Sequence, residues 1–195
     1  MVTKPGGLTD HARYQAIRGA IGQLEGDGAL GSWSGHGYRC VRVKYAMGDD
    51  LMSGAGSAQH GGRFTRPGGS ATVYAATDVL LAVAETLANY ARQQRQPWQV
   101  SPLVIVAVEA RLERVLDLTT EVNRGFVGLR AEELANEDWQ ASNDSGGESL
   151  CQAVGRAAHD AGVEGLLVPS RLREGGANIV LFPDLVPAGR LVPLR

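Results

Sequence analysis

A glycine-rich segment in the first half of the chain limits what the sequence can fold into. Seven of the 26 glycines lie between residues 48 and 69, a stretch without clear helical or strand periodicity. A loop of that length inside a compact domain is uncommon and is usually functional. Glycine also lets backbone N–H groups come close to a bound anion. We therefore expect a single domain in which this segment shapes a binding site.

The rest of the chain alternates between helical and strand periodicity. The expected helices cover residues 10–26, 78–96, 129–138 and 146–161, with Thr9 or Asp10, Thr77 or Asp78, and a Ser145–Glu148 capping box as start signals. The expected strands cover residues 38–45, 71–75, 103–108, 165–168 and 178–182, with 111–117 as a further strand or a turn and a short edge strand after Pro183. This order predicts an α+β, or mixed α/β, architecture without an internal repeat.

Composition and charge exclude several classes of protein. Hydrophobic residues make up 44% and charged residues 21% of the 195 residues, which excludes a wholly disordered chain. The 19 basic and 21 acidic residues nearly cancel, so we expect neither direct nucleic-acid binding nor a membrane patch. Cys40 and Cys151 are too few for a disulfide framework, and no Cys/His cluster has metal-binding spacing. Without an apolar leader or a membrane-length apolar run, the sequence predicts a cytoplasmic protein.

One expected helix carries a carboxylate in an unusual position. Glu85 lies at the edge of an apolar stripe that comprises Leu80, Leu81, Ala84, Leu87, Ala88 and Ala91. A carboxylate there is partly removed from water and needs a partner, for which arginine is the natural choice. Arg39, near the start of a strand, and Arg63, inside the glycine-rich segment, are the candidates. The alternative is that all three charged side chains simply face water.

Three further polar residues stand near strand ends. Tyr74 precedes the helix that carries Glu85, Ser170 follows the strand 165–168, and Asn178 opens the last long strand. Strand packing for Tyr74 and turn capping for Ser170 are the structural alternatives. With the arginines and glycines, these residues suggest a ligand with negative charge and a sugar or aromatic part. The GxGxxG, GxxxxGK[ST] and GxSxG motifs do not occur where such folds need them.

In their order along the chain, these segments resemble the RES domain family. The matching residues are Tyr38-Arg39, Gly61-Gly62-Arg63-Phe64, Val73-Tyr74, Ala82-Val83-Ala84-Glu85, Val168-Pro169-Ser170 and Asn178-Ile179-Val180-Leu181-Phe182. Arg63 and Tyr74 are eleven residues apart, as are Tyr74 and Glu85, and this block is the most specific part. The resemblance covers residues 36–182. We therefore expect the family domain over residues 36–195, with an N-terminal helical extension, residues 1–35, packed on it.

The resemblance implies a fold related to ADP-ribosyltransferases, with a central, mostly antiparallel or split β-sheet flanked by helices. It implies a bacterial toxin that depletes NAD+ by cleaving the nicotinamide–ribose bond, as a phosphorylase or a glycohydrolase, and that a cognate Xre-like antitoxin neutralises. NAD+ is then a substrate and inorganic phosphate an optional co-substrate, with no prosthetic group. A mono-ADP-ribosyltransferase toxin and a non-catalytic nucleotide-binding module stay open as alternatives, and so does a homodimer.

The resemblance also implies roles for six residues. Arg39, Glu85 and Ser170 would be catalytic, and NAD+ would be bound by Arg39, Arg63, Tyr74, Glu85, Ser170 and Asn178. Glu85 would stabilise positive charge on the ribose carbon, and the arginines would bind the pyrophosphate or the attacking phosphate. Tyr74 would stack on the nicotinamide ring, and Ser170 would hydrogen-bond the ribose or an anion. The sequence leaves open which arginine binds phosphate and what the insert 125–147 does.

Overall fold

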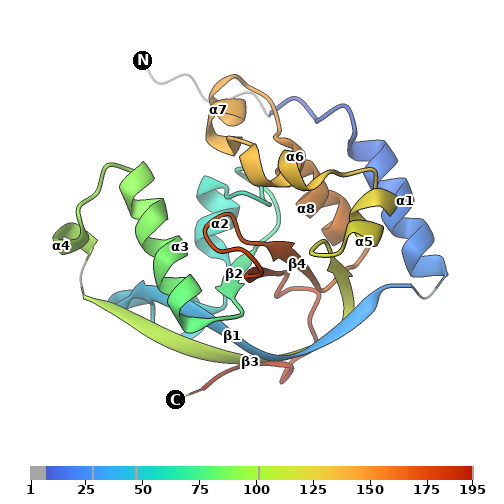
Figure 1. Ribbon diagram of the computed structural model, residues 1–195. Coiled ribbons are helices and arrows are strands. Elements are labelled where there is room, and N and C mark those ends of the chain that lie inside the picture. Colours follow the sequence, from blue (N-terminus) through green and yellow to red (C-terminus); the bar gives the residue numbers. More distant parts are fainter. Residues whose placement is uncertain (1–7, 28, 47, 101, 195) are drawn as a thin grey trace.

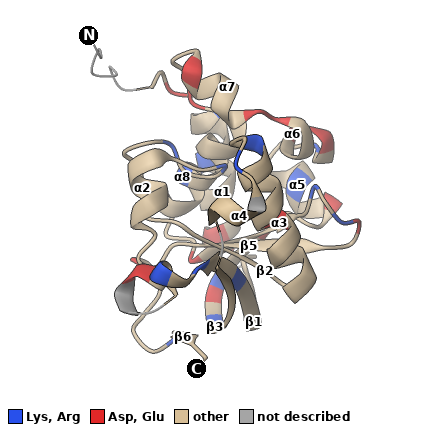
Figure 2. Ribbon diagram, turned by 90° about the vertical axis from the view of Figure 1, so that its left-hand side faces the viewer, with Lys and Arg blue, Asp and Glu red and all other residues tan. Residues whose placement is uncertain are grey.

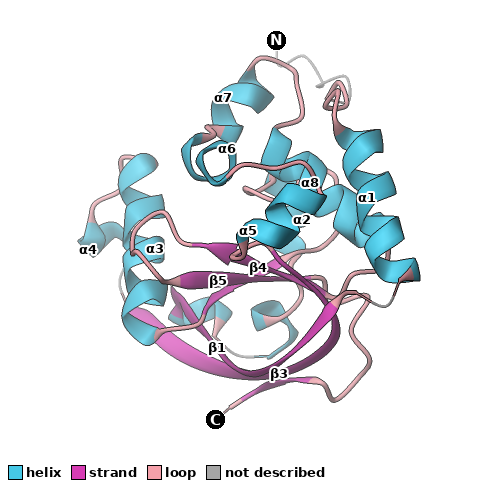
Figure 3. Cartoon of the chain, turned by 45° about the vertical axis from the view of Figure 1, so that its right-hand side comes forward, coloured by secondary structure: helices cyan, strands magenta, loops and turns pink. Residues whose placement is uncertain are grey.

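Six strands form one sheet that closes on itself. In the computed structural model, which describes residues 8–27, 29–46, 48–100 and 102–194, the strands are β1 (Gly31–Arg42), β2 (Val73–Ala76), β3 (Leu103–Asp117), β4 (Gly165–Pro169), β5 (Ala177–Leu181) and β6 (Leu191–Pro193). Their order is β1-β2-β5-β4-β3-β6, and β1 also pairs with β3, so the first five strands make a ring (Figure 3). Only the β3–β4 pair is parallel among the described strands. The expected α+β fold with a mostly antiparallel sheet is confirmed.

The two longest strands, β1 and β3, close the ring. Their ladder runs from Gly31 opposite Val115 to Arg42 opposite Leu103. The end of β3 then pairs with β4, and its middle pairs with β6. Residues 103–108 and 111–117, predicted as two separate segments, form one 15-residue strand in the structure. Its second half alternates charged residues with buried Ala110 and Leu112, because one face meets the core and the other meets water.

Eight α-helices and two 3-10 helices are present in the described part of the chain. They are α1 (Tyr14–Gly26), α2 (Ala55–His60), α3 (Val79–Arg92), α4 (Pro97–Val100), α5 (Glu121–Phe126), α6 (Ala131–Asn136), α7 (Trp139–Asp144) and α8 (Leu150–Asp160), with η1 (Val43–Tyr45) and η2 (Gly48–Leu51). Helices α1 and α5–α8 gather over one part of the sheet, while α3 and α4 lie over another (Figure 1). The insert 125–147 thus holds the end of α5 together with α6 and α7.

Several predicted boundaries are corrected by the structure. The strand expected at residues 38–45 is shifted, since β1 begins at Gly31 and ends at Arg42, and the segment 48–69 contains η2 and α2 rather than continuous loop. Helix α1 begins at Tyr14, because Thr9 pairs with Gly147 instead of capping a helix. Asp78 caps α3 as predicted, since its carboxylate accepts a hydrogen bond from the Leu81 amide.

The predicted capping box of α8 is wrong by four residues. Ser149 and Gln152 form it: the Ser149 hydroxyl accepts from the Gln152 amide, and the Gln152 side chain accepts from the Ser149 amide. Glu148, the predicted box partner, has a fully buried side chain that pairs with Arg156 at 2.6 Å. A buried carboxylate needs such a partner, so it is not free to cap the helix.

Three hydrophobic clusters are buried in the described part of the chain, and the smallest, Cys40, Ala76, Leu81 and Ala82, joins α3 to β1 and β2. The two larger clusters divide most of the interior. One lies between the helices and the sheet, and α1 supplies Tyr14, Ile17, Ile21 and Leu24 to it, the four positions expected from helical spacing. The other draws side chains from all five ring strands and therefore fills the ring: Trp33, Val73, Ala110, Leu112, Val115, Leu167, Ile179 and Leu181. The two faces of each ring strand consequently meet different cores.

Charged residues of both signs are interspersed over the helices and along β3 (Figure 2). This distribution agrees with the formal net charge of −2. Among the helices that the structure describes, none combines the length and the apolar character needed to cross a bilayer.

Candidate active site

Glu85 on α3 is held by donors from the ends of β4 and β5. The Ser170 hydroxyl and the Asn178 amide nitrogen both donate to Glu85 Oε1, at 2.9 and 2.8 Å. Ser170 lies 85 residues and Asn178 lies 93 residues after Glu85 along the chain. The prediction that they share a site agrees with this geometry. Because both bonds end on the same oxygen, Oε2 is left for another partner.

The loop after β4 is fixed on both sides of this cluster. The Ser170 hydroxyl also accepts from the Leu172 amide at 3.0 Å, so its one proton is directed at Glu85. Arg173 pairs with Asp78 at 2.8 Å, which ties the loop to the first turn of α3. Arg171 donates to the Glu137 carbonyl at 3.5 Å on the opposite side. The loop therefore spans from α3 to the segment between α6 and α7.

Arg63 lies at the tip of a tight turn. Gly62 and Thr65 bond each other through both backbone pairs, at 2.7 and 3.3 Å, so Arg63 and Phe64 project from the turn. The buried Phe64 ring anchors the turn in the core, and the Arg63 guanidinium lies 5.3 Å from its centroid. Arg63 also donates to the Leu134 carbonyl of α6.

Tyr74 supports this turn from β2. Its hydroxyl accepts from the Phe64 amide at 2.9 Å. A Cβ atom on Gly62 would lie 2.7 Å from the same hydroxyl, so a side chain at residue 62 would displace the Tyr74 hydroxyl from its contact. Burial, partly offset by the Phe64 amide, raises the pKa of Tyr74 to about 12. The Tyr74 hydroxyl thus holds the turn, and the stacking of its ring on nicotinamide stays a prediction.

The turn and the glutamate cluster lie on one face of the sheet. Tyr74 pairs with Val180 and Ala76 pairs with Asn178, so Tyr74 and Asn178 share a face, two positions apart along the ladder. Two positions correspond to about 7 Å along a strand. The two groups of predicted site residues are therefore neighbours.

The Arg39 side chain extends from the face of β1 that is opposite to the face packed against α3. Tyr38 pairs with Ala76 and, with Cys40, packs beside α3, and alternation directs Arg39 away from them. The structure does not join Arg39 to Glu85 by a hydrogen bond. Its Nε and Nη1 atoms are buried without a partner in the described part of the chain, as is Arg63 Nε. Burial lowers the pKa of Arg39 to about 10.

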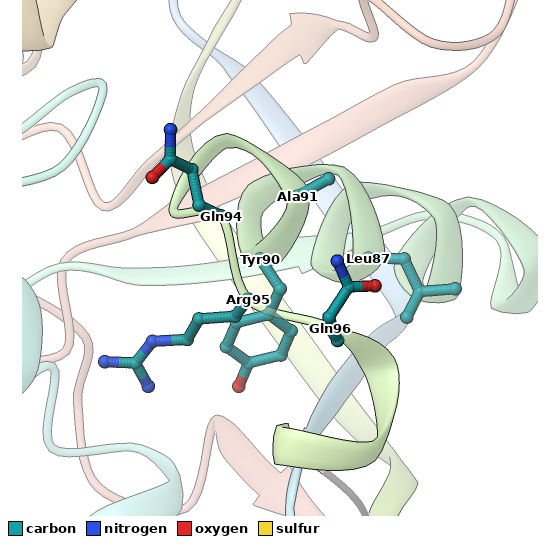
Figure 4. Close-up of a pocket in the computed structure, with 6 residues that line it drawn as sticks. All are labelled: Leu87, Tyr90, Ala91, Gln94, Arg95 and Gln96. Carbon is teal, nitrogen blue, oxygen red and sulfur yellow. The ribbon is translucent and has the colours of Figure 1, made fainter.

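The surface hollow with the most enclosed shape among those described does not include the predicted site residues. This hollow of about 320 Å³ is lined by Leu87, Tyr90, Ala91, Gln94, Arg95 and Gln96, at the carboxyl end of α3 (Figure 4). Glu85 precedes it on the same helix but does not line it. Among the described residues, no group of three or more His, Cys, Asp or Glu side chains is placed to hold a metal ion.

Sequence reasoning missed the residue that joins the arginine turn to α8. Gln152 is fully buried and donates to the carbonyls of Gly62 and Thr65, 90 and 87 residues away. Its position in the true capping box was a readable signal, but the box was assigned to Ser145 and Glu148. The contact to the turn depends on tertiary structure and has no local signature.

Fold and site together define a one-domain α+β protein with a glutamate-centred site beside an arginine-bearing glycine turn. Residues 36–194 match the family model described as the RES domain, so the chain belongs to this family and the resemblance is confirmed. The match begins five residues after the start of β1.

Relatives with known names agree with this membership. The chain is 28% identical over 165 residues to the NAD(+) phosphorylase MbcT of Mycobacterium bovis, which covers 84% of this chain and 80% of the relative. The same values hold for MbcT of Mycobacterium tuberculosis. The crystal structure of the M. tuberculosis MbcT–MbcA toxin–antitoxin complex contains a chain with the same fold, at a TM-score of 0.74 and 24% identity over 94% of this chain and 92% of that chain.

Proposed function

We propose that this protein is a bacterial toxin that consumes NAD+ by phosphorolysis of the nicotinamide–ribose bond. One observation supports it most directly. In the described part of the chain, the buried side-chain nitrogen atoms without a partner belong to Arg39 and Arg63, the two arginines expected to bind phosphate groups. Buried donors without partners are costly, and an anion that accepts from them removes that cost. NAD+ and inorganic phosphate both supply such anions.

The proposed reaction balances without a redox step. The bond between the ribose carbon and the nicotinamide nitrogen breaks, and its electron pair leaves with neutral nicotinamide. An oxygen of inorganic phosphate forms the new bond to the same carbon, which yields ADP-ribose phosphate. Positive charge builds on the ribose carbon in the transition state, so a nearby carboxylate lowers the barrier.

Glu85 suits that role because one of its oxygens is already fixed. Ser170 and Asn178 hold Oε1, which orients the carboxylate and leaves Oε2 to face a ribose. In this arrangement Ser170 orients the glutamate by donating its hydroxyl hydrogen to Oε1. Arg63 binds an anion beside this carboxylate, and Arg39 binds an anion from the other face of β1.

The test is release of nicotinamide from NAD+ by the purified protein, with and without phosphate. We expect consumption that requires phosphate and the appearance of ADP-ribose phosphate by phosphorus NMR. Consumption without phosphate would indicate a glycohydrolase. Intact NAD+ under both conditions would overturn the proposal of an NAD+-consuming enzyme and favour a binding module. A mass increase on a protein target with little loss of NAD+ would indicate an ADP-ribosyltransferase.

Glu85→Gln is the sharpest variant for this site. Glutamine can still accept from Ser170 and Asn178, so the fold should persist, but the negative charge near the ribose is lost. We expect kcat to fall by at least about 100-fold, in the range seen when an electrostatic stabiliser is removed. Glu132→Gln, at an exposed position of α6, is the matched control and should keep full activity. Equal turnover in wild type and Glu85→Gln would exclude this role.

A cognate antitoxin is the proposed partner, because the similar fold of MbcT was solved with the antitoxin MbcA. We place the action in the bacterial cytoplasm, where NAD+ is available. Co-expression with the antitoxin should restore the growth of cells that the toxin alone arrests.

A further inference from the structure

A single buried glutamine connects α8 to the turn that presents Arg63. Gln152 has no exposed surface, yet its side chain can donate two hydrogens and accept at one oxygen. The amide nitrogen Nε2 lies 3.1 Å from the Gly62 carbonyl oxygen and 3.3 Å from that of Thr65. These are the two residues that close the turn around Arg63 and Phe64. Both ends of the turn are therefore fixed to one side-chain atom.

The orientation of this amide is itself fixed. Its oxygen accepts from the Ser149 amide at 3.1 Å and from Asn143 Nδ2 at 2.7 Å. Its nitrogen also donates to Asn143 Oδ1 at 2.9 Å. A flipped amide would place its nitrogen against the Ser149 N–H, so only one orientation satisfies the site. One hydrogen of Nε2 therefore goes to Asn143, and the other is shared between the Gly62 and Thr65 carbonyls.

Close backbone packing also holds the turn against α8, one turn of the helix beyond Gln152. Gly155 lies three residues after Gln152, and a Cβ atom there would overlap the Phe64 carbonyl oxygen. The Phe64 side chain is 1% exposed in the helical core. The turn is thus pressed against α8 on one side and bonded to Tyr74 on the other, which leaves Arg63 as its projecting polar group.

We propose that Gln152 is a positioning residue for Arg63: it fixes the turn so that the guanidinium faces the bound anion. This inference rests on the proposed function for the identity of the anion. The geometry of the turn itself does not depend on it. Gln152 touches no substrate in this assignment and acts only through Arg63.

The test uses Gln152→Glu, which keeps the acceptor oxygen but replaces the donor by an oxygen facing two carbonyl groups. A double-mutant cycle with Arg63→Ala separates positioning from general damage. We expect kcat/KM for NAD+ to fall by about tenfold in the wild-type background and by less than about twofold in Arg63→Ala. Equal losses in both backgrounds, or no loss in either, would overturn the proposal.

Ser149→Ala is the matched structural control. It removes the other half of the capping box, the bond from the Gln152 amide at 3.2 Å, without touching the turn. We expect Ser149→Ala to lower Tm by about as much as the Gln152 variants do, but to keep kcat/KM within about twofold of wild type. Gln152→Met, which introduces no charge, replaces Gln152→Glu in the cycle if the latter does not fold. An activity loss in Ser149→Ala as large as that in the Gln152 variants would show that the effect is only structural.

A second readout does not involve NAD+ and so separates this proposal from the proposed function. Hydrogen exchange of the Phe64 and Thr65 amides should become at least about tenfold faster in Gln152→Glu, because the turn is released. In Ser149→Ala the same amides should exchange at the wild-type rate, while the first turn of α8 exchanges faster. Unchanged exchange at Phe64 and Thr65 in the Gln152 variant would overturn the proposal even if NAD+ is consumed. Faster exchange without NAD+ consumption would instead refute only the function.

Discussion

At the residue scale, the site depends on polar groups that each have a fixed partner. Glu85 Oε1 receives two donors, and the Tyr74 hydroxyl receives the Phe64 amide. Each bond joins segments that are distant in sequence or meet across a turn. A conservative substitution at such a position therefore removes a hydrogen bond and also frees the partner group to change its orientation. The guanidinium groups of Arg39 and Arg63 are the exception, because each has buried nitrogen atoms without a partner in the described part of the chain.

Tyr74 gives a prediction on pH dependence. Its pKa is about 12 in the folded protein and about 10 in an unfolded chain, so the unfolded state loses this proton first as the pH rises. The stability that the buried phenol contributes is therefore complete below pH 10 and is lost between pH 10 and 12. The loss is at most about 1.4 kcal/mol for each pH unit.

Urea denaturation of wild type and Tyr74→Phe measures this effect. Near neutral pH the variant should be less stable by about 1–3 kcal/mol, because the Phe64 N–H loses its buried acceptor. The difference should shrink as the pH rises above 10, since phenylalanine does not titrate. A difference that stays constant up to pH 11.5 would contradict the raised pKa.

At the scale of elements, α3 shows which face of a helix a sequence can and cannot identify. The predicted stripe included Leu80, Ala84 and Leu87, but Leu80 is 74% exposed and Ala84 lies at the surface. The covered face instead contains Leu81 and Ala82, with Glu85 and Thr86 one turn later. Thr86 donates to the Cys40 carbonyl of β1 at 3.0 Å. Glu85 consequently lies within the covered face and not at its edge.

Leu80 and Leu81 form a matched pair for testing this assignment. Leu81 is 1% exposed and packs on β1 and β2, so Leu81→Ala should cost about 2–5 kcal/mol of unfolding free energy. Leu80→Ala should change it by no more than about 0.5 kcal/mol, because little buried surface is lost. Chemical denaturation of both variants measures the difference. Similar losses in the two variants would place Leu80 in a packed environment.

The sequence predicted the elements better than it predicted their pairing. The longer helices and strands, the Asp78 cap and the buried face of α1 follow from local periodicity and capping chemistry, whereas the short helices α2, α4, α5 and α7 were not predicted. Residues 31–37 were left out of the expected strand, because glycines are unfavourable in strands. In the structure Gly37 lets β1 pass close to β2, since a Cβ atom on residue 37 would lie 3.0 Å from the Ala75 Cβ atom. The grouping of Glu85 with Ser170 and Asn178 came from their order in a family. The Gln152 contact and the direction of Arg39 depend on register, which local sequence does not encode.

At the scale of the whole molecule, the helix that precedes the family match is part of the core. Four side chains of α1 are buried against α8 and its neighbours, and Arg156 of α8 lies 3.4 Å from the centroid of the Tyr14 ring. The Thr9–Gly147 bridge adds backbone pairing between the same two regions. The family domain and this helix therefore share one hydrophobic cluster.

Removal of residues 1–27 tests this dependence. The four buried side chains of α1 contribute about 1.5–3 kcal/mol each, a sum comparable with the net stability of a typical domain. We expect the shortened chain to lose its cooperative thermal transition by circular dichroism. Ile17→Ala should lower Tm, while Arg18→Ala, at an exposed position of the same helix, should not. A cooperative transition near the wild-type Tm in the shortened chain would show that α1 is dispensable.

The closed ring also has a consequence for the order of events during synthesis. Glu85 leaves the ribosome long before its partners, since Ser170 and Asn178 follow 85 and 93 residues later. The strand that carries Asn178 must pair with β2 and β4 to bring it to α3. Until then β2 has only β1 beside it, and the carboxylate has neither donor. The site therefore becomes ordered only after the segment that carries β5 has been synthesised.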